Sequence, residues 1–362
     1  MATVSERLWR ALPEIAGGIP VDGAVLTSAA NCRYLSGFAS SAHTVFITKE
    51  ETYFLTDFRY GEAARKKSKD CKVVTYQRLE KSMEEIIRRH ELKNVLFEHQ
   101  AMTLADADRF GKLCQELGVN AVWDSTLDNA INAIRSVKTP AEVEKIKAAQ
   151  ALTDAAFAHI LPQLQVGKTE RDIALEIEFF MRKNGADGVA FDLIVVSGAN
   201  GSQCHGVPGE KTLEQGDFIT MDTGALLDGY HSDMTRTVAL GSVSEEQKKV
   251  YHTVLQAQIA AIQTIRAGIH CHVVDRAARE IIDQEYPGTF GHTTGHSLGV
   301  EIHEWPYFGP ACEAMTRPGM VMTVEPGIYL EGKFGVRIED MVLITETGCE
   351  NLTHSPKELI IV

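Results

Sequence analysis

Residues 221–237 read MDTGALLDGYHSDMTRT and place two acids, Asp222 and Asp233, in a stretch with the pattern of a β-hairpin. Asp228-Gly229 is a strong signal for a two-residue turn, and that turn pairs Asp222 with Thr235 across the arms. Asp233, two residues from Thr235, then lies on the same face, so the acids are diagonal neighbours about 7–8 Å apart. Because like charges on one face repel, the pair needs a positive partner. Surface exposure, or pairing of one acid with Arg236, is the alternative.

Three histidines follow in FGHTTGHSLGVEIHEWP, at His292, His296 and His303. Their spacing suits one side of a helix, but Gly295 and Gly299 favour a loop or a backbone packed closely against a site. Such a group of imidazoles among glycines indicates metal binding or acid–base chemistry.

Two glutamates lie in apolar runs near the end of the chain. Glu325 precedes Pro326 in TVEPGIYL, and Glu339 follows Arg337 in GVRIEDMVLIT. A carboxylate buried in such surroundings requires a cation. For Glu339, a salt bridge with Arg337 on the same strand face is the alternative.

Taken together, these segments supply four carboxylates and one imidazole: Asp222, Asp233, His296, Glu325 and Glu339. Two divalent cations would balance the four negative charges. A ligand set rich in oxygen with one nitrogen suits Mn²⁺, Co²⁺ or Zn²⁺. Two such ions about 3.5–4 Å apart can hold a bridging water and clamp a reacting carbonyl, which predicts a hydrolase.

The chain has 362 residues, which predicts two domains. The first part alternates strand-like and helical runs, as an α/β domain does. Thr139, Pro140 and Glu142 then form a capping box that begins a helix and the second domain. A second capping box runs from Thr169 to Asp172, and helices beside mostly antiparallel strands predict an α+β domain. The predicted domains are 1–133 and 139–362.

The amino-acid composition limits the classes of partner that the protein is expected to bind. The formal net charge of −13 disfavours nucleic acid and anionic membranes, and no run is apolar enough to span a bilayer. The seven scattered cysteines and the lack of a secretory signal predict reduced thiols in the cytoplasm. The tripeptide HCH at 270–272 is not expected to bind metal, because three adjacent residues cannot all point one way.

The order of five motifs resembles a known family: Asp-x-Gly, Ser-Asp-x-Thr-Arg-Thr, Gly-His-x-x-Gly-His-x-x-Gly-x-x-x-His-Glu, Val-Glu-Pro-Gly and Arg-Ile-Glu-Asp. It is the signature of the pita-bread dinuclear metallopeptidases, in the branch of Xaa-Pro aminopeptidases and prolidases. NCRYLSGF and YFLTDFRY resemble the creatinase-type first domain of that branch. The resemblance implies an α+β pita-bread catalytic domain preceded by an α/β creatinase-type amino-terminal domain, and a homodimer.

By motif, the resemblance implies that Asp222 binds one metal ion and that His296 and Glu325 bind the other, with Asp233 and Glu339 bridging both. It implies Mn²⁺ first, with Co²⁺ or Zn²⁺ as alternatives. Glu325 would also take a proton from the attacking bridging water or hydroxide and pass it to the leaving amine.

Four further residues match the family by motif. His205, in GSQCHGVPG, would position the peptide substrate. His292 and His303 would steady the scissile carbonyl and its tetrahedral intermediate. Arg337 would orient a bridging carboxylate.

The activity implied is removal of the amino-terminal residue, preferably before proline. A strict Xaa-Pro dipeptidase is the main alternative. A methionine aminopeptidase shares the ligands but not the first domain, and a creatinase lacks the metal set. A binding protein on the same fold would typically lose ligands, which are intact here.

Overall fold

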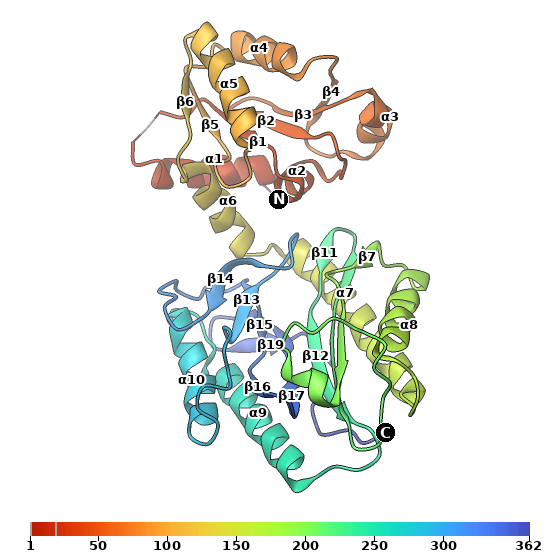
Figure 1. The fold of residues 1–362 in the computed structure, drawn as a ribbon. Helices are drawn as coiled ribbons and strands as arrows, with labels where there is room; N and C mark the ends of the chain where they lie inside the picture. The colour runs from red at the N-terminus through yellow and green to blue at the C-terminus, as the bar shows by residue number, and fades with distance from the viewer. Residues whose placement is uncertain (1, 19) are drawn as a thin grey trace. The chain divides into compact units, whose positions relative to one another are not determined.

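Two units, Met1–Arg135 and Ser136–Val362, make up the chain in the computed structural model, which describes residues 2–18 and 20–362 (Figure 1). Each unit has its own sheets, helices and apolar core. None of the helices in these two ranges combines the length and apolar character that crossing a bilayer demands.

The first unit is built on a mixed sheet in the order β4-β3-β2-β1-β5-β6. Its strands are β1 (Gly23–Leu26), β2 (Thr44–Thr48), β3 (Thr52–Thr56), β4 (Lys72–Thr75), β5 (Asn94–Phe97) and β6 (Asn120–Val122). Its helices are α1 (Val4–Ile15), α2 (Ala29–Ser36), α3 (Phe58–Lys67), α4 (Leu79–Arg89), α5 (Leu104–Leu117) and α6 (Thr126–Ser136). Helices α4 and α5 bury Met83 and Phe110 against Val25 and Phe97 of the sheet, so the predicted α/β character is confirmed.

The second unit pairs its strands in antiparallel fashion, in the orders β12-β9-β8, β11-β10-β7, β14-β13-β15-β18-β19 and β16-β17. The strands are β7 (Gly188–Val189), β8 (Ile194–Ser197), β9 (Phe218–Thr223), β10 (Ala225–Leu227), β11 (Tyr230–His231), β12 (Met234–Ala239), β13 (Gly295–Ser297), β14 (Glu304–Phe308), β15 (Val321–Val324), β16 (Gly327–Leu330), β17 (Phe334–Arg337), β18 (Asp340–Ile344) and β19 (Cys349–Asn351). The helices are α7 (Pro140–Ile160), α8 (Glu170–Lys183), α9 (Glu245–Thr264) and α10 (Cys271–Asp283), with 3₁₀ turns at Leu161–Gln163 and Gly198–Ser202.

Two helix pairs flank these strands (Figure 1). Helices α7 and α8 pack on β8, β9 and β12, while α9 and α10 pack on β15, β17 and β18. Both predicted capping boxes are present: Thr139 begins α7 with Glu142, and Thr169 begins α8 with Asp172. The helices therefore lie on the outside of the second unit, and the strands on its inside are available to form a site.

Candidate metal centre

The hairpin that carries the two aspartates has the predicted register. Thr235 pairs with Asp222 across β12 and β9, and the same alignment continues into β10 and β11. Asp228 and Gly229 have φ of 48° and 81°, the left-handed values that a type I′ turn requires at both central positions.

The hairpin is nevertheless not one continuous ladder. Its two arms leave one sheet and enter another at Gly224 and Ser232, where the backbones come very close. A Cβ atom on Gly224 would lie 2.1 Å from the carbonyl oxygen of Ser232, so only glycine fits there. Asp233 consequently lies in the gap between β11 and β12, not within a strand as expected.

Glu325 and Glu339 also lie at strand breaks. Glu325 directly follows β15, and Glu339 lies between β17 and β18, so the expectation that both sit inside apolar strands is wrong in this detail. Residues released from the ladder can turn their side chains toward a common point, which strict strand alternation would prevent. His296, in contrast, lies within β13, and not on a helix or in a loop.

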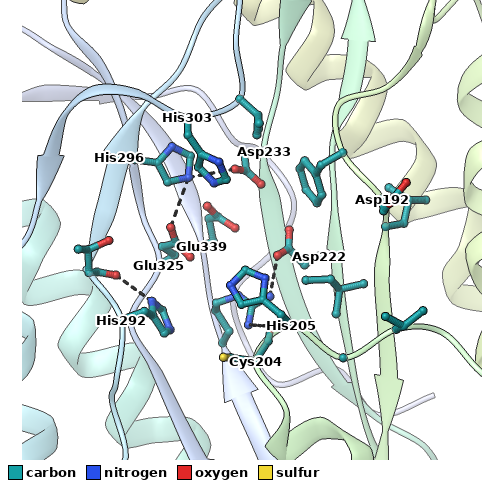
Figure 2. Close-up of a pocket in the computed structure, with 18 of the residues that line it drawn as sticks. Asp192, Cys204, His205, Asp222, Asp233, His292, His296, His303, Glu325 and Glu339 are labelled. Carbon is teal, nitrogen blue, oxygen red and sulfur yellow. Dashed lines mark hydrogen bonds and ion pairs between the residues drawn. The ribbon is translucent and has the colours of Figure 1, made fainter. Parts of the chain in front are cut away.

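These side chains converge. Figure 2 shows Asp222, Asp233, His296, Glu325 and Glu339 directed into one cavity of about 540 Å³. Nε2 of His296 lies 3.4 Å from Oδ2 of Asp233 and 3.5 Å from Oε1 of Glu325. Asp233, His296 and Glu339 each offer a ligand atom within 4.8 Å of the others.

Two carboxylate oxygens of this group are buried without a partner. Oδ1 of Asp222 and Oε1 of Glu339 make no hydrogen bond to any residue that the structure describes. Glu339 is 1% exposed and Asp233 is 4% exposed, so water is not the natural partner of either side chain. Unpaired buried carboxylate oxygens are costly, and with a single imidazole they form the donor set of hard or borderline divalent cations. The residues therefore fit a metal centre.

The protonation properties of the group point the same way. Burial raises the pKa of Glu339 well above its usual range, and the charges of Asp233 and Glu325 add to the rise. Burial also raises the pKa of Asp233 to about 6 and that of Glu325 to about 7. For His296 burial lowers the pKa, but the hydrogen bond to Asp233 and the charge of Glu325 raise it to about 9. The chain thus concentrates negative charge that positive ions would stabilise.

Arg337 lies elsewhere than predicted. It is not the salt-bridge partner of Glu339: its Nη2 lies 2.6 Å from Oδ2 of Asp222. Its Nε donates to Oγ1 of Thr235 at 3.0 Å, and Thr235 donates to Oε2 of Glu339 at 2.7 Å. The alternative of a salt bridge with Glu339 is therefore wrong, and the orienting role toward a bridging carboxylate stays a prediction: Arg337 holds Asp222 directly and reaches Glu339 through Thr235.

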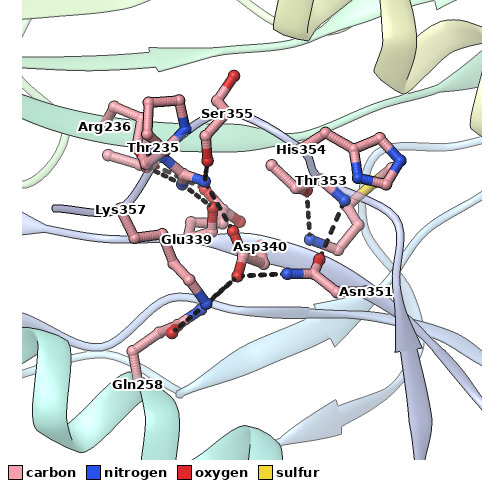
Figure 3. A network of polar contacts seen from close by, with 12 residues as sticks. Thr235, Arg236, Gln258, Glu339, Asp340, Asn351, Thr353, His354, Ser355 and Lys357 are labelled. Atoms are coloured by element: carbon pink, nitrogen blue, oxygen red, sulfur yellow. Dashed lines mark hydrogen bonds and ion pairs between the residues drawn. The ribbon is translucent and has the colours of Figure 1, made fainter.

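A second buried cation, Arg236, fixes the backbone beside Glu339 (Figure 3). Arg236 donates to the carbonyl oxygens of Glu339 and Ser355 and to Oδ1 of Asp340 at 2.8 Å. The alternative that Arg236 pairs with a hairpin aspartate is therefore wrong. The other oxygen of Asp340 accepts from Lys357 at 2.6 Å, and also from Gln258 and Asn351. Sequence reasoning missed this network, whose one signal is an aspartate directly after Glu339 in an apolar run.

The three remaining histidines all line the cavity, but they differ in what they can donate. Nδ1 of His292 lies 2.8 Å from the carbonyl oxygen of Thr293, and its Nε2 lies 2.9 Å from the hydroxyl of Tyr329. Burial, helped by the charge of Arg337, lowers the pKa of His292 to about 4, so this imidazole is neutral. Both of its nitrogens are engaged, and a contact with substrate requires it to exchange one partner.

His205 and His303 make no hydrogen bond with any described residue, so their nitrogens face the cavity unengaged. The ring of His303 packs edge-on at 4.5 Å from that of His296, and burial lowers its pKa. Tyr329, which sequence reasoning missed, accepts from Arg337 at 2.8 Å and so joins the His292 side of the site to the Asp222 side.

Much of the remaining lining is apolar, and sequence reasoning gave it no role. It includes Phe191, Leu193, Ile194, Val207, Pro208 and Ile302, together with Asp192, Cys204, Gly206 and Thr293. The cavity thus has one wall of charged and imidazole groups and another of hydrocarbon, the usual make-up of a small-molecule or peptide site.

Comparison with known proteins gives matches along both units. Residues 144–346 match the metallopeptidase family M24, and residues 10–137 match the creatinase/prolidase N-terminal domain. The chain is 34% identical to the Xaa-Pro dipeptidase of Pyrococcus furiosus over 94% of its own length and 95% of that protein. Its fold is similar to the Xaa-Pro dipeptidase from Bacillus anthracis (TM-score 0.91, 38% identity, 99% of each chain) and the X-Pro aminopeptidase from Thermotoga maritima (TM-score 0.90, 35% identity, 100% of each chain). The predicted fold, a pita-bread catalytic domain after a creatinase-type domain, is confirmed.

Proposed function

Because the chain belongs to metallopeptidase family M24 and is therefore a metal-dependent peptidase, we propose that it removes the amino-terminal residue from peptides whose second residue is proline. The observation that carries this proposal is the convergence of the five predicted ligands on one cavity, with unpaired oxygens on Asp222 and Glu339. One guanidinium and one imidazole cannot balance four carboxylates, and the donor set fits the cations that peptide hydrolysis at a metal centre requires.

In this proposal two divalent cations share the five side chains. Asp222 would hold one, His296 and Glu325 would hold the other, and Asp233 and Glu339 would be shared by both. When bound, the cations lower the pKa of a water molecule and polarise the scissile carbonyl. We propose Mn²⁺ as the native ion and Co²⁺ and Zn²⁺ as alternatives. All three ions accept oxygen ligands together with one imidazole.

The proton is assigned to Glu325. Its Oε1 accepts from Oγ1 of Thr323 at 3.3 Å and lies 3.5 Å from Nε2 of His296, so the carboxylate is held at the cavity. A carboxylate beside the attacking water can accept a proton and return it. Glu325 therefore takes the proton of the attacking water and delivers it to the leaving proline nitrogen, which must become a secondary amine.

His303 is the donor best placed for the scissile carbonyl, since its ring lies against His296 and its nitrogens are unengaged. His205 faces the same cavity and would position the peptide. His292 can contact the substrate only after one of its nitrogens has given up its hydrogen bond to Tyr329 or to the carbonyl oxygen of Thr293. Donors aimed at the developing negative charge stabilise the tetrahedral intermediate.

The preference for proline rests on the relatives and on the apolar wall. The names of the Pyrococcus, Bacillus and Thermotoga proteins all specify a bond before proline. Phe191, Leu193 and Ile302 offer hydrocarbon surface suited to a ring that has no N–H to donate.

A strict Xaa-Pro dipeptidase is the second candidate. It is favoured by the Pyrococcus and Bacillus anthracis proteins, which carry that name and are 34% and 38% identical to this chain. An aminopeptidase accepts a chain beyond the second residue, whereas a dipeptidase closes the site behind it. We also expect a homodimer, which light scattering of the purified protein would test.

The deciding experiment measures the cleavage of a panel of peptides and the metal content of the protein that cleaves them. Ala-Pro, Ala-Pro-Ala-Ala, Ala-Ala-Ala and Met-Ala-Ser are offered to Mn²⁺-loaded protein and to protein treated with a chelator. We expect cleavage of both proline peptides by the loaded protein only. Cleavage of Ala-Pro alone would replace the aminopeptidase with the dipeptidase. Faster cleavage of Met-Ala-Ser than of either proline peptide, or full activity after chelation, would overturn the proposal.

A further inference from the structure

The tripeptide His270-Cys271-His272 lies at the start of α10, with His270 as the extended N-cap and Cys271 and His272 in the first helical turn, and its backbone contacts residues 312–315. His270 forms a β-bridge with Met315, and the amide of Cys271 donates to the carbonyl oxygen of Ala314 at 2.8 Å. Cys271 points into the core, where it is 0% exposed, whereas His270 is exposed and His272 is partly exposed.

The argument that the three residues cannot all point one way is confirmed, because Cys271 is buried, but it does not apply to the two histidines alone. The two imidazole rings lie nearly parallel, with centroids 5.3 Å apart and planes inclined by 13°. The ladder to residues 312–315 fixes the backbone beneath them, so the two rings are held side by side by the fold.

A carboxylate completes the group. Glu313, on the paired segment, places one oxygen 3.5 Å from Nδ1 of His270 and the other 3.6 Å from Nδ1 of His272. One ligand atom from each of the three side chains lies within 4.8 Å of the other two.

The hydrogen bonds leave nitrogen lone pairs available. Nδ1 of His270 lies 2.8 Å from the carbonyl oxygen of Glu313, so it carries the ring hydrogen and Nε2 keeps a lone pair. Nδ1 of His272 is buried and makes no hydrogen bond to any described residue. His270 therefore offers a metal ion its Nε2, or its Nδ1 once the hydrogen bond to the Glu313 carbonyl oxygen is given up, and His272 and Glu313 add an unengaged nitrogen and a carboxylate.

We propose that His270, His272 and Glu313 form a further metal site, separate from the dinuclear centre, that binds one late first-row transition ion such as Ni²⁺, Cu²⁺ or Zn²⁺. Imidazole nitrogens select these ions over Mg²⁺ and Ca²⁺, which take oxygen ligands. Glu313 supplies negative charge, and its exposure leaves the remaining coordination positions to water.

The competing account is a cluster of protonated histidines paired with Glu313, which needs no metal. The two accounts differ in pH dependence. Metal binding requires neutral imidazole and weakens as the solution becomes acidic, whereas the ion-pair cluster forms only there.

The test is a Ni²⁺ titration of the Mn²⁺-loaded protein by calorimetry at pH 7.5, with both metals counted afterwards. We expect one Ni²⁺ per chain to be bound without loss of Mn²⁺, and no such binding at pH 5. His270→Ala and His272→Ala should each weaken binding at least about tenfold, since even the loss of a residue that only orients a ligand costs about that much. His252→Ala/His354→Ala, which removes two exposed histidines elsewhere, is the matched control and should leave binding unchanged.

A second measurement needs no variant. The electron paramagnetic resonance spectrum of Cu²⁺ added to protein whose dinuclear centre holds diamagnetic Zn²⁺, so that no manganese signal overlaps, should show coupling to two nitrogen nuclei. Ni²⁺ that only displaces Mn²⁺, equal binding by the control and by His270→Ala/His272→Ala, or a copper spectrum without nitrogen coupling would each overturn the proposal.

Discussion

Removing the metal ions should reverse the way in which stability responds to pH. In the chelated protein His296 keeps its hydrogen bond to Asp233 and its pKa of about 9, against about 6.5 in an unfolded chain. A histidine whose pKa is raised by folding stabilises the folded state fully below the unfolded value, and this contribution is lost as the pH rises through the folded one. The stability of the chelated protein should therefore increase when the pH is lowered from 8.5 to 6.5.

The magnitude follows from the width of that window. Each pH unit between the two pKa values of His296 is worth about 1.4 kcal/mol, so the change from pH 8.5 to 6.5 is about 2 kcal/mol. Glu325 and Asp233, with pKa values raised to about 7 and about 6, act in the same direction at the acidic end. Below pH 6.5 His292 opposes them, because its pKa is lowered to about 4 and the unfolded chain then binds the extra proton.

Urea unfolding in the presence of a chelator, followed by circular dichroism at constant ionic strength, measures this change. His296→Gln is the control and should remove most of the pH dependence within the window. The Mn²⁺-loaded protein should behave in the opposite way, because protons compete with the ions for the same ligands. A chelated protein whose stability is flat or falls from pH 8.5 to 6.5 would refute the assigned electrostatics of the site.

Three further changes test the surroundings of the site. Tyr329→Phe removes the hydroxyl that joins His292 to Arg337, and should lower kcat about ten- to a hundredfold with metal content unchanged, as a peptidase assay with metal counting would show. Asp340→Asn leaves Arg236 without its buried carboxylate and should lower the free energy of unfolding by about 3 kcal/mol, measured in urea. Gly224→Ala forces a Cβ atom against a carbonyl oxygen at 2.1 Å and should cost about 2 kcal/mol in the same assay, whereas a glycine in open surroundings tolerates alanine.

Much of the site could be predicted because its signals are local. The turn at Asp228-Gly229 determines that Asp222 pairs with Thr235, and the capping residues Thr139 and Thr169 mark the starts of two helices. Acids in apolar runs are unusual wherever they occur, so each ligand could be recognised from its own neighbours in the sequence.

What could not be predicted depends on contacts between distant segments. Arg337 is two residues from Glu339 yet binds Asp222, because the strand break at Glu339 turns that side chain away from its neighbour. Tyr329 has no feature in the sequence that distinguishes it from an ordinary strand residue, and only the fold brings it to His292. The break beside Asp233 lies where two backbones meet too closely for a side chain, at Gly224, and no local feature of the sequence indicates such an approach.

The contact between Arg337 and Asp222 also alters the charge of the filled pocket. The four ligand carboxylates and the buried guanidinium carry three negative charges, which two divalent ions would exceed by one; the fifth lining carboxylate, Asp192, is exposed to solvent. An excess positive charge shielded from solvent attracts a small counter-ion. Phosphate in the buffer, or the carboxylate of an amino acid just released, should therefore linger in the cavity and compete with the next peptide, so product departure becomes a step that this arginine influences.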